Sequence, residues 1–194
     1  QLGRSIMADH KELEKHCRPT GHWWHGYWTS AISSAIEIAT CRAGLTYIPA
    51  ARILALRGVS MGIPVSGSKL IPDQLFALQY PDGYRAFALE VDRGTEPVRS
   101  PAARKSLARS VAQYREVLPN ELHKRHYGLK SGLMVLNVFK SPGRQRQFRD
   151  LQRLGDRVLL AQTVSGDVPR VMQVLQLVKR QWRGVEDAAF SLLG

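Results

Sequence analysis

The sequence predicts a mixed α/β domain in which helices flank a central mixed sheet that contains an antiparallel hairpin. The chain has 194 residues, 44% of them apolar, which is enough for one hydrophobic core. Stretches with helical and with strand periodicity follow one another along the chain. Turn residues join two neighbouring strand-like stretches, as expected for a hairpin. The order helix, strand, strand, helix, strand, helix, strand, helix is typical of such a domain.

The elements of the first half follow from apolar spacing and from residues that break helices and strands. A helix is predicted from a cap at Thr29 or Ser30 to about residue 42. The apolar side chains spaced for one helical face are Trp28, Ile32, Ala35, Ile36 and Ala39. A short apolar segment at 45–48 and a short helix after Pro49 come next. Strands are predicted at 70–79 and 84–92, because the turn Pro81-Asp82-Gly83 favours an antiparallel hairpin.

The second half alternates helices with buried strands. A helix over 101–118 has its apolar residues on one side, and the polar residues 119–131 are expected to be irregular. Continuous apolar runs at 132–139 and 158–164 are typical of strands that are buried on both faces. The remaining predicted elements are helical: one that starts at Pro142, one over 171–182 and a short one over 190–193.

The charge of the chain narrows its functional class. Lys and Arg number 28 against 16 acidic residues, which gives a formal net charge of +12. The excess lies in clusters within predicted folded segments, which favours a polyanionic partner such as DNA over a merely solvated surface. No apolar run suits a membrane span, two cysteines do not make a disulfide scaffold, and no nucleotide-binding glycine motif occurs. We therefore expect a cytoplasmic DNA-binding protein without a membrane partner or a nucleotide cofactor.

Three carboxylates mark a candidate site on the predicted hairpin. Glu90 and Asp92 end the second strand two residues apart, so both side chains leave the same face, and Asp73 follows Pro72 on the first strand. A two-residue loop would bring Asp73 opposite Asp92, a four-residue loop opposite Glu90, and a three-residue loop would point it away. Carboxylates gathered beside a basic surface suit Mg²⁺ or Mn²⁺ and phosphodiester hydrolysis. A structural role for each acid, in a turn or at a strand end, is the alternative.

These motifs resemble the PD-(D/E)xK nuclease superfamily, whose hallmark is Pro-Asp on one core strand and acid-x-Lys on the next. The matching residues are Pro72-Asp73 and Glu90-Val91-Asp92. The string Glu90-Val-Asp-Arg-Gly-Thr-Glu96, with Lys105 and Tyr114 on the following helix, is more closely similar to the plasmid replication-relaxation family. The resemblance implies a restriction-endonuclease-like core and Mg²⁺ or Mn²⁺ as the cofactor.

The resemblance also suggests how the chain is organised. It covers residues 25–165, the expected core domain. Residues 1–24 would be an N-terminal helical extension, a remnant of a truncated upstream segment, since family members usually carry a winged-helix DNA-binding segment there. Residues 166–194 are expected to be a helical segment packed on the core. Nucleases of this kind often pair to cut two strands, which implies a homodimer, and other replication or mobilisation proteins are further implied partners.

The resemblance assigns residue roles, with one departure, because the superfamily pattern has a Lys where this chain has Asp92. The predicted catalytic residues are Asp73, Glu90, Asp92 and Lys105, and Lys105 reaches the site only if the start of its helix overhangs the strand ends. The predicted metal ligands are Asp73, Glu90, Asp92 and, on the preceding helix, Glu37. The predicted DNA-binding residues are all basic: Arg93, Arg104, Arg109, Lys124, Arg125, Lys130, Arg144, Arg146 and Arg149.

The predicted function is DNA binding with metal-dependent, endonuclease-like hydrolysis in plasmid or mobile-element DNA processing. The missing lysine at position 92 favours an alternative, a catalytically inactive DNA-binding accessory factor with the same fold. A module whose basic face docks an acidic protein is a third class. The aromatic cluster at 23–28 is expected to pack the first helix on the sheet rather than to stack bases. A zinc site is disfavoured by the spacing of its candidate ligands, His16, Cys17, His22 and His25.

Overall fold

The computed structural model describes residues 23–101, 105–165, 171–185 and 188–194, so the predictions for residues 1–22 and for Arg104 lie outside the described residues. The predicted mixed α/β class is confirmed, with helices around a seven-stranded mixed sheet and a separate two-stranded antiparallel sheet. Along the chain the elements are α2 (Trp23–Arg42), β1 (Thr46–Pro49), α3 (Ala50–Ala55), β2 (Ile63–Val65), β3 (Ser68–Leu70), β4 (Gln74–Tyr80), β5 (Gly83–Asp92), α4 (Leu107–Val117), α5 (Leu122–Tyr127), β6 (Leu133–Phe139), α6 (Pro142–Arg149), β7 (Leu159–Thr163), α7 (Val171–Lys179), β8 (Trp182–Arg183) and β9 (Ala189–Phe190).

The large sheet has the strand order β1-β4-β5-β6-β7-β8-β9. β1, β4 and β5 are antiparallel, whereas β5, β6 and β7 run parallel. Parallel neighbours need crossover connections, and here α4 with α5 and then α6 supply them. As a result the carboxyl ends of β5, β6 and β7 and the start of β4 meet at one edge of the sheet.

The predicted β4–β5 hairpin is confirmed, and its register settles where Asp73 lies. Tyr80 pairs with Gly83, so the loop has two residues, Pro81 and Asp82. We expected a two-residue loop to bring Asp73 opposite Asp92. Because β5 begins one residue earlier than that expectation assumed, Gln74 pairs with Leu89. The same register, continued by one residue, sets Asp73 opposite Glu90.

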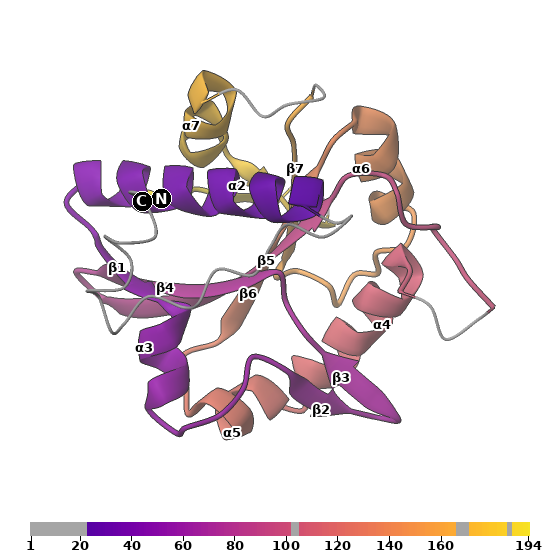
Figure 1. The fold of residues 1–194 in the computed structure, drawn as a ribbon, viewed down its shortest axis with the longest axis horizontal. Helices are drawn as coiled ribbons and strands as arrows, with labels where there is room; N and C mark the ends of the chain where they lie inside the picture. Colours follow the sequence, from indigo (N-terminus) through magenta and orange to yellow (C-terminus); the bar gives the residue numbers. More distant parts are fainter. Residues whose placement is uncertain (1–22, 102–104, 166–170, 186–187) are drawn as a thin grey trace, which may run out of the picture.

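Helices cover both faces of the large sheet (Figure 1). α2 and α7 lie on one face, and the predicted apolar stripe of α2, from Trp28 to Ala39, is buried there against the sheet. The helices α3, α4, α5 and α6 contribute buried side chains to the other face, led by Ile53, Tyr114, Tyr127 and Phe148. Burial on both faces explains why the central strands read as continuous apolar runs.

Two segments differ in kind from their sequence-based predictions, and two helices begin elsewhere than expected: α2 begins at Trp23, before the expected cap at Thr29 or Ser30, and α4 begins after Ser106 instead of near residue 101. Residues 119–131 were expected to be irregular but contain the short helix α5, which begins after Glu121 in a left-handed conformation and ends at Gly128. Residues 190–193 were expected to be helical, but Ala189–Phe190 form β9, which pairs with β8. The unpaired edge of β7 offers backbone hydrogen bonds to β8, and local propensity does not reveal such a long-range partner.

Candidate functional site

Asp73 lies at the edge of the sheet where β4 begins and β5 ends. Its Oδ2 accepts a hydrogen bond from the backbone N–H of Val91 at 2.8 Å, and its Oδ1 lies 3.0 Å from Nε2 of His25 in α2. Burial acts to raise the pKa of Asp73, but the bond from His25 and the charge of Lys105 outweigh it and hold the pKa below its ordinary value. Asp73 is therefore a fixed, ionised carboxylate.

Glu90 is the buried carboxyl opposite it, on the face of β5 that α4 covers. Its Oε1 accepts a hydrogen bond from the hydroxyl of Tyr114 at 2.7 Å. Burial, and next the negative charge of Asp73, raise the pKa of Glu90 to about 8, although Lys105 and Tyr114 act against them. A buried acid with so strongly raised a pKa beside a second acid is a common mark of a functional site.

Lys105 meets both acids. Its Nζ lies 3.6 Å from Oε2 of Glu90, 3.7 Å from Oδ1 of Asp73 and 3.8 Å from Oε1 of Glu96. It reaches them because it comes just before α4, whose cap is Ser106, so the side chain overhangs the strand ends as the prediction required. Burial acts to lower the pKa of Lys105. The three surrounding carboxylates raise it by more, so the pKa of Lys105 lies above its ordinary value.

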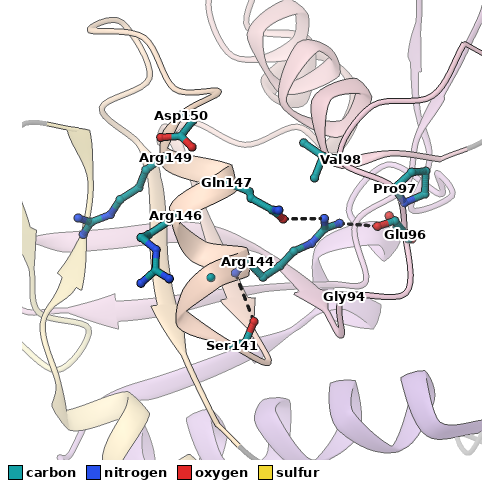
Figure 2. Close-up of a pocket in the computed structure, with 11 residues that line it drawn as sticks. Gly94, Glu96, Pro97, Val98, Ser141, Arg144, Arg146, Gln147, Arg149 and Asp150 are labelled. Carbon is teal, nitrogen blue, oxygen red and sulfur yellow. Dashed lines mark hydrogen bonds between the residues drawn. The ribbon is translucent and has the colours of Figure 1, made fainter.

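Two hollows adjoin this group. One, of about 370 Å³, contains Glu90 and Lys105 and is further lined by Lys69, Ile71 and Arg109, among others. The second, of about 850 Å³, lies between residues 94–98 and α6 (Figure 2). Glu96 lines the second hollow, and its carboxylate lies 3.8 Å from the ammonium of Lys105, which lines the first.

Asp92 does not join this group, contrary to our expectation. Its Oδ2 accepts a hydrogen bond from Nε of Arg144 at 2.8 Å, and its Oδ1 accepts one from the backbone N–H of Gly94 at 2.6 Å. Glu90 and Asp92 do share a face of β5, but Asp92 sits at the end of the strand and turns to α6. Arg144, predicted to bind DNA, is buried in this pair and is therefore not an accessible DNA contact.

Glu37 is likewise not brought to the site, so its prediction as a metal ligand is not supported by the geometry. It follows His25 on the same helix by twelve residues, or about 18 Å at 1.5 Å per residue. Its side chain is exposed and acts electrostatically on Tyr47, which pairs with Leu78, far along β4 from Asp73. Among the residues that the structure describes, no three His, Cys, Asp or Glu side chains are arranged to hold a metal ion.

The predicted DNA-binding residues fall into two regions. Arg109 lines the smaller hollow, Arg146 and Arg149 line the larger one, and Arg93 follows β5 nearby. The second region holds Lys124 and Arg125, on α5, and Lys130, which follows that helix. The backbone N–H of Lys130 donates to the hydroxyl of Tyr84, which lies about 20 Å from Glu90 along β5 at 3.3 Å per residue. Only the first region surrounds the carboxylates.

His25 and Glu96 are site residues whose roles were not predicted. His25 was considered as a zinc ligand, but it contacts Asp73, and the other zinc candidates lie outside the described residues. Trp28, about one turn after His25 on α2, is buried as expected, whereas Trp23 and Tyr27 are 47% and 42% exposed. Glu96 belongs to the string Asp92-Arg-Gly-Thr-Glu96 that carries the family resemblance, but its contact with Lys105 depends on a turn at Gly94, where φ is positive.

The comparisons with known proteins give one family. A sequence model described as replication-relaxation matches residues 6–133, well over half of the 194 residues and including Asp73, Glu90, Lys105 and Tyr114. No curated protein and no solved structure matches the chain. Within the described part of the chain, no helix has the length and apolar character to cross a membrane. On the strength of the family match, the chain belongs to the replication-relaxation family.

Proposed function

We propose that this protein binds DNA and hydrolyses phosphodiester bonds at the group formed by Asp73, Glu90 and Lys105, with Mg²⁺ or Mn²⁺ as the cofactor. The family membership connects the chain to plasmid replication or relaxation, a setting in which DNA is the natural polyanion. The observation that carries the proposal is the position of the Lys105 ammonium, within 3.8 Å of carboxylates from three segments at the mouth of a hollow.

The order of elements supports a restriction-endonuclease-like core as part of this proposal. α2 is followed by the antiparallel strands β1, β4 and β5, then by α4, and then by β6, which is parallel to β5. Pro72-Asp73 precedes one core strand and Glu90 lies on the next, as in the resemblance to PD-(D/E)xK nucleases. Lys105 would do from the start of α4 what the missing strand lysine does in that pattern.

The donor chemistry of the site fits a small, hard cation. Asp73 Oδ1 and Glu90 Oε2 flank a point where a positive charge, the Lys105 ammonium, already lies. Mg²⁺ commonly binds one or two carboxylates and keeps several waters, so these two residues suffice to hold it. When bound, such a metal supplies charge stabilisation at a phosphate oxygen and an activated water.

The residues of the chain have distinct roles in this proposal. Asp73 and Glu90 hold the cation. Neighbouring groups orient those two carboxylates. Tyr114 fixes Oε1 of Glu90, so that Oε2 is the oxygen near Lys105. The N–H of Val91 fixes Oδ2 of Asp73, and His25 contacts Oδ1, the oxygen that lies near Lys105. Lys105 binds the phosphate and stabilises the negative charge that develops on it during attack. Arg109, on the same hollow, is placed to contact a neighbouring phosphate.

The proposal is tested with Asp73→Asn and Glu90→Gln, which change charge but little volume. We expect both variants to lose nicking of supercoiled plasmid DNA and cleavage of single-stranded and branched DNA in Mn²⁺, with duplex affinity by fluorescence anisotropy kept within about threefold. Glu37→Gln, an equally conservative change of an exposed acid, is the matched control and should cleave like the wild type. Wild-type protein that cuts none of these substrates refutes the catalytic proposal.

A DNA-binding accessory factor without catalysis is the second candidate, and one observation favours it. Lys105 balances the charge of Asp73, the raised pKa of Glu90 keeps that acid mostly protonated at neutral pH, and Asp92 is tied to Arg144, so the chain alone balances these charges. Calorimetric titration with Mn²⁺ separates the two candidates. Binding at one site that disappears in Asp73→Asn supports the enzyme, whereas DNA binding without any site-specific metal binding supports the accessory factor.

A further inference from the structure

Asp92 stands where the nuclease pattern has its lysine, and its contacts give it another role. Both of its oxygens are engaged, Oδ1 by the N–H of Gly94 at 2.6 Å and Oδ2 by Nε of Arg144 at 2.8 Å. Neither oxygen is directed at Asp73 or Glu90. The side chain thus fixes the end of β5 to α6 instead of contacting a substrate or a cation.

Arg144 extends this connection to the following loop. Its Nη2 donates to the backbone carbonyl of Glu96 at 2.7 Å, and its Nη1 donates to Oε1 of Gln147 at 3.2 Å (Figure 2). All three guanidinium nitrogens therefore have partners, and they lie on three different segments. The planar guanidinium forms such bonds in a fixed geometry, so one side chain defines how β5, the loop 94–98 and α6 lie relative to one another.

The loop 94–98 in turn is bonded to the segment that carries Lys105. The backbone N–H of Leu107 donates to the carbonyl of Pro97 at 3.2 Å, and that of Ala108 donates to the carbonyl of Val98 at 2.9 Å. The carboxylate of Glu96 lies 3.8 Å from the Lys105 ammonium. The loop therefore constrains Lys105 in two ways. It bonds the backbone of the residues that follow Lys105, and the carboxylate of Glu96 attracts the ammonium at the end of the Lys105 side chain.

We propose that Asp92 and Arg144 are positioning residues for Lys105: they fix the loop 94–98, and through its backbone and Glu96 this loop holds the ammonium between Asp73 and Glu90. This inference rests on the proposed function and explains how the site does without a lysine at position 92. A buried ion pair contributes little net stability compared with a packed apolar pair, which leaves geometry as its main contribution here.

The test measures Lys105 directly and needs neither DNA nor metal. Lysines of the intact protein are acylated briefly with N-hydroxysuccinimide acetate, and the labelling of each is followed by peptide mass spectrometry. A lysine amine that is held among three carboxylates reacts with the acylating reagent more slowly than one that has moved away from them. We expect labelling of Lys105 to rise at least about threefold in Arg144→Met, Asp92→Asn and Glu96→Gln, while labelling of Lys124, which pairs with Glu121, stays constant.

Arg115→Met is the matched control, because Arg115 also forms an ion pair with a buried acid, Asp156, at 2.6 Å, and its hydrogen bonds go to Asp156 and Leu151 instead of the loop 94–98. This variant should be destabilised in urea unfolding without a change in Lys105 labelling. If Arg144→Met does not fold, Asp92→Asn and Glu96→Gln decide, since Glu96 is partly exposed and its change leaves the ion pair intact. Unchanged Lys105 labelling in the folded variants overturns the proposal.

Kinetics provide a second measurement in case cleavage is observed. Arg144→Met should lower kcat with KM nearly unchanged, and the double variant Arg144→Met/Lys105→Met should be no slower than Lys105→Met alone, because both changes remove the same interaction. Losses that multiply would show that Arg144 acts independently of Lys105 and overturn the proposal. A wild type without cleavage would refute the proposed function and leave the labelling result to decide on the positioning.

Discussion

Replacing Glu90 with glutamine should stabilise the folded protein, and the gain should grow with pH. In the folded protein, burial and the charge of Asp73 raise the pKa of Glu90 to about 8 from an ordinary 4.5. Between these values the folded protein holds a proton on Glu90 that the unfolded chain has released. The folded state therefore binds more protons than the unfolded state, and the wild type loses stability as pH rises. Glutamine keeps the shape and can still accept the bond from Tyr114, but it does not titrate.

The magnitude follows from the two pKa values. Each pH unit between them costs the wild type about 1.4 kcal/mol relative to a side chain that does not titrate. From pH 6 to pH 8 the free energy of unfolding of Glu90→Gln should thus gain about 2 kcal/mol on that of the wild type, allowing for partial ionisation near pH 8. Other ionisable groups, such as Asp73 and His25, are present in both proteins, so their contributions to the difference in unfolding free energy largely cancel.

Urea unfolding followed by tryptophan fluorescence measures this difference at pH 6, 7 and 8, with EDTA present so that adventitious metal does not neutralise the acids. Glu37→Gln, which removes an exposed acid from α2, is the control. Its free energy of unfolding should differ from that of the wild type by the same amount at all three pH values. A Glu90→Gln difference that is independent of pH would refute the reasoning, because it would mean that Glu90 is ionised in the folded protein over the whole range.

Four further outcomes are expected. Trp28→Ala should lower the free energy of unfolding by about 3–5 kcal/mol in urea, since a fully buried tryptophan leaves a large cavity between α2 and the sheet. Tyr114→Phe should cost about 1–2 kcal/mol in the same assay, because it removes the hydrogen bond to a buried carboxyl. Burial lowers the pKa of His123, so stability should fall as pH drops below about 6.5, and His123→Leu should weaken that dependence between pH 5 and 7. Arg146→Ala should make the slope of log affinity against log salt concentration shallower by about one in anisotropy titrations with duplex DNA, because one phosphate contact is lost. An unchanged slope would exclude Arg146 from the interface.

Local patterns were sufficient for much of the fold. The stripe of α2, the proline that starts α6 and the apolar runs of β6 and β7 each depend on residues within a few positions. The end of α2, the start of α6 and the bounds of β6 and β7 were predicted close to where they are observed, whereas α2 begins six residues before the expected cap at Thr29. The strands β8 and β9 were not predicted, because their pairing depends on the open edge of β7, which is distant in sequence. The start of α4 differed for a local reason, since Ser106 caps it five residues after the expected beginning.

The candidate site divides in the same way. Asp73 and Glu90 were identified by motif, and their convergence required only the hairpin register, which a loop shorter or longer by one residue would have reversed. Asp92 was expected to share the site because it lies two residues from Glu90 and therefore on the same face of β5. That spacing does not show which side chain Asp92 meets at the end of the strand. That neighbour is Arg144, which approaches from 52 residues away along the chain. The same limit applies to His25, whose partner Asp73 lies across the edge of the sheet on another element.

The sequence by itself determined the α/β class, the hairpin, the identity of the candidate acids and the strongly basic character, because these depend on composition, periodicity and short motifs. The hairpin register that sets Asp73 opposite Glu90 came only from the structure. The tertiary structure decided which charges meet. Lys105 reaches Asp73 and Glu90 since the chain after β5 turns at Gly94 and returns over the strand ends, whereas Glu37 and the cluster at 124–130 lie elsewhere on the fold. Electrostatic contacts fall off within a few ångströms in the presence of solvent and salt, so their pattern depends on the three-dimensional placement of whole elements and not on spacing along the chain.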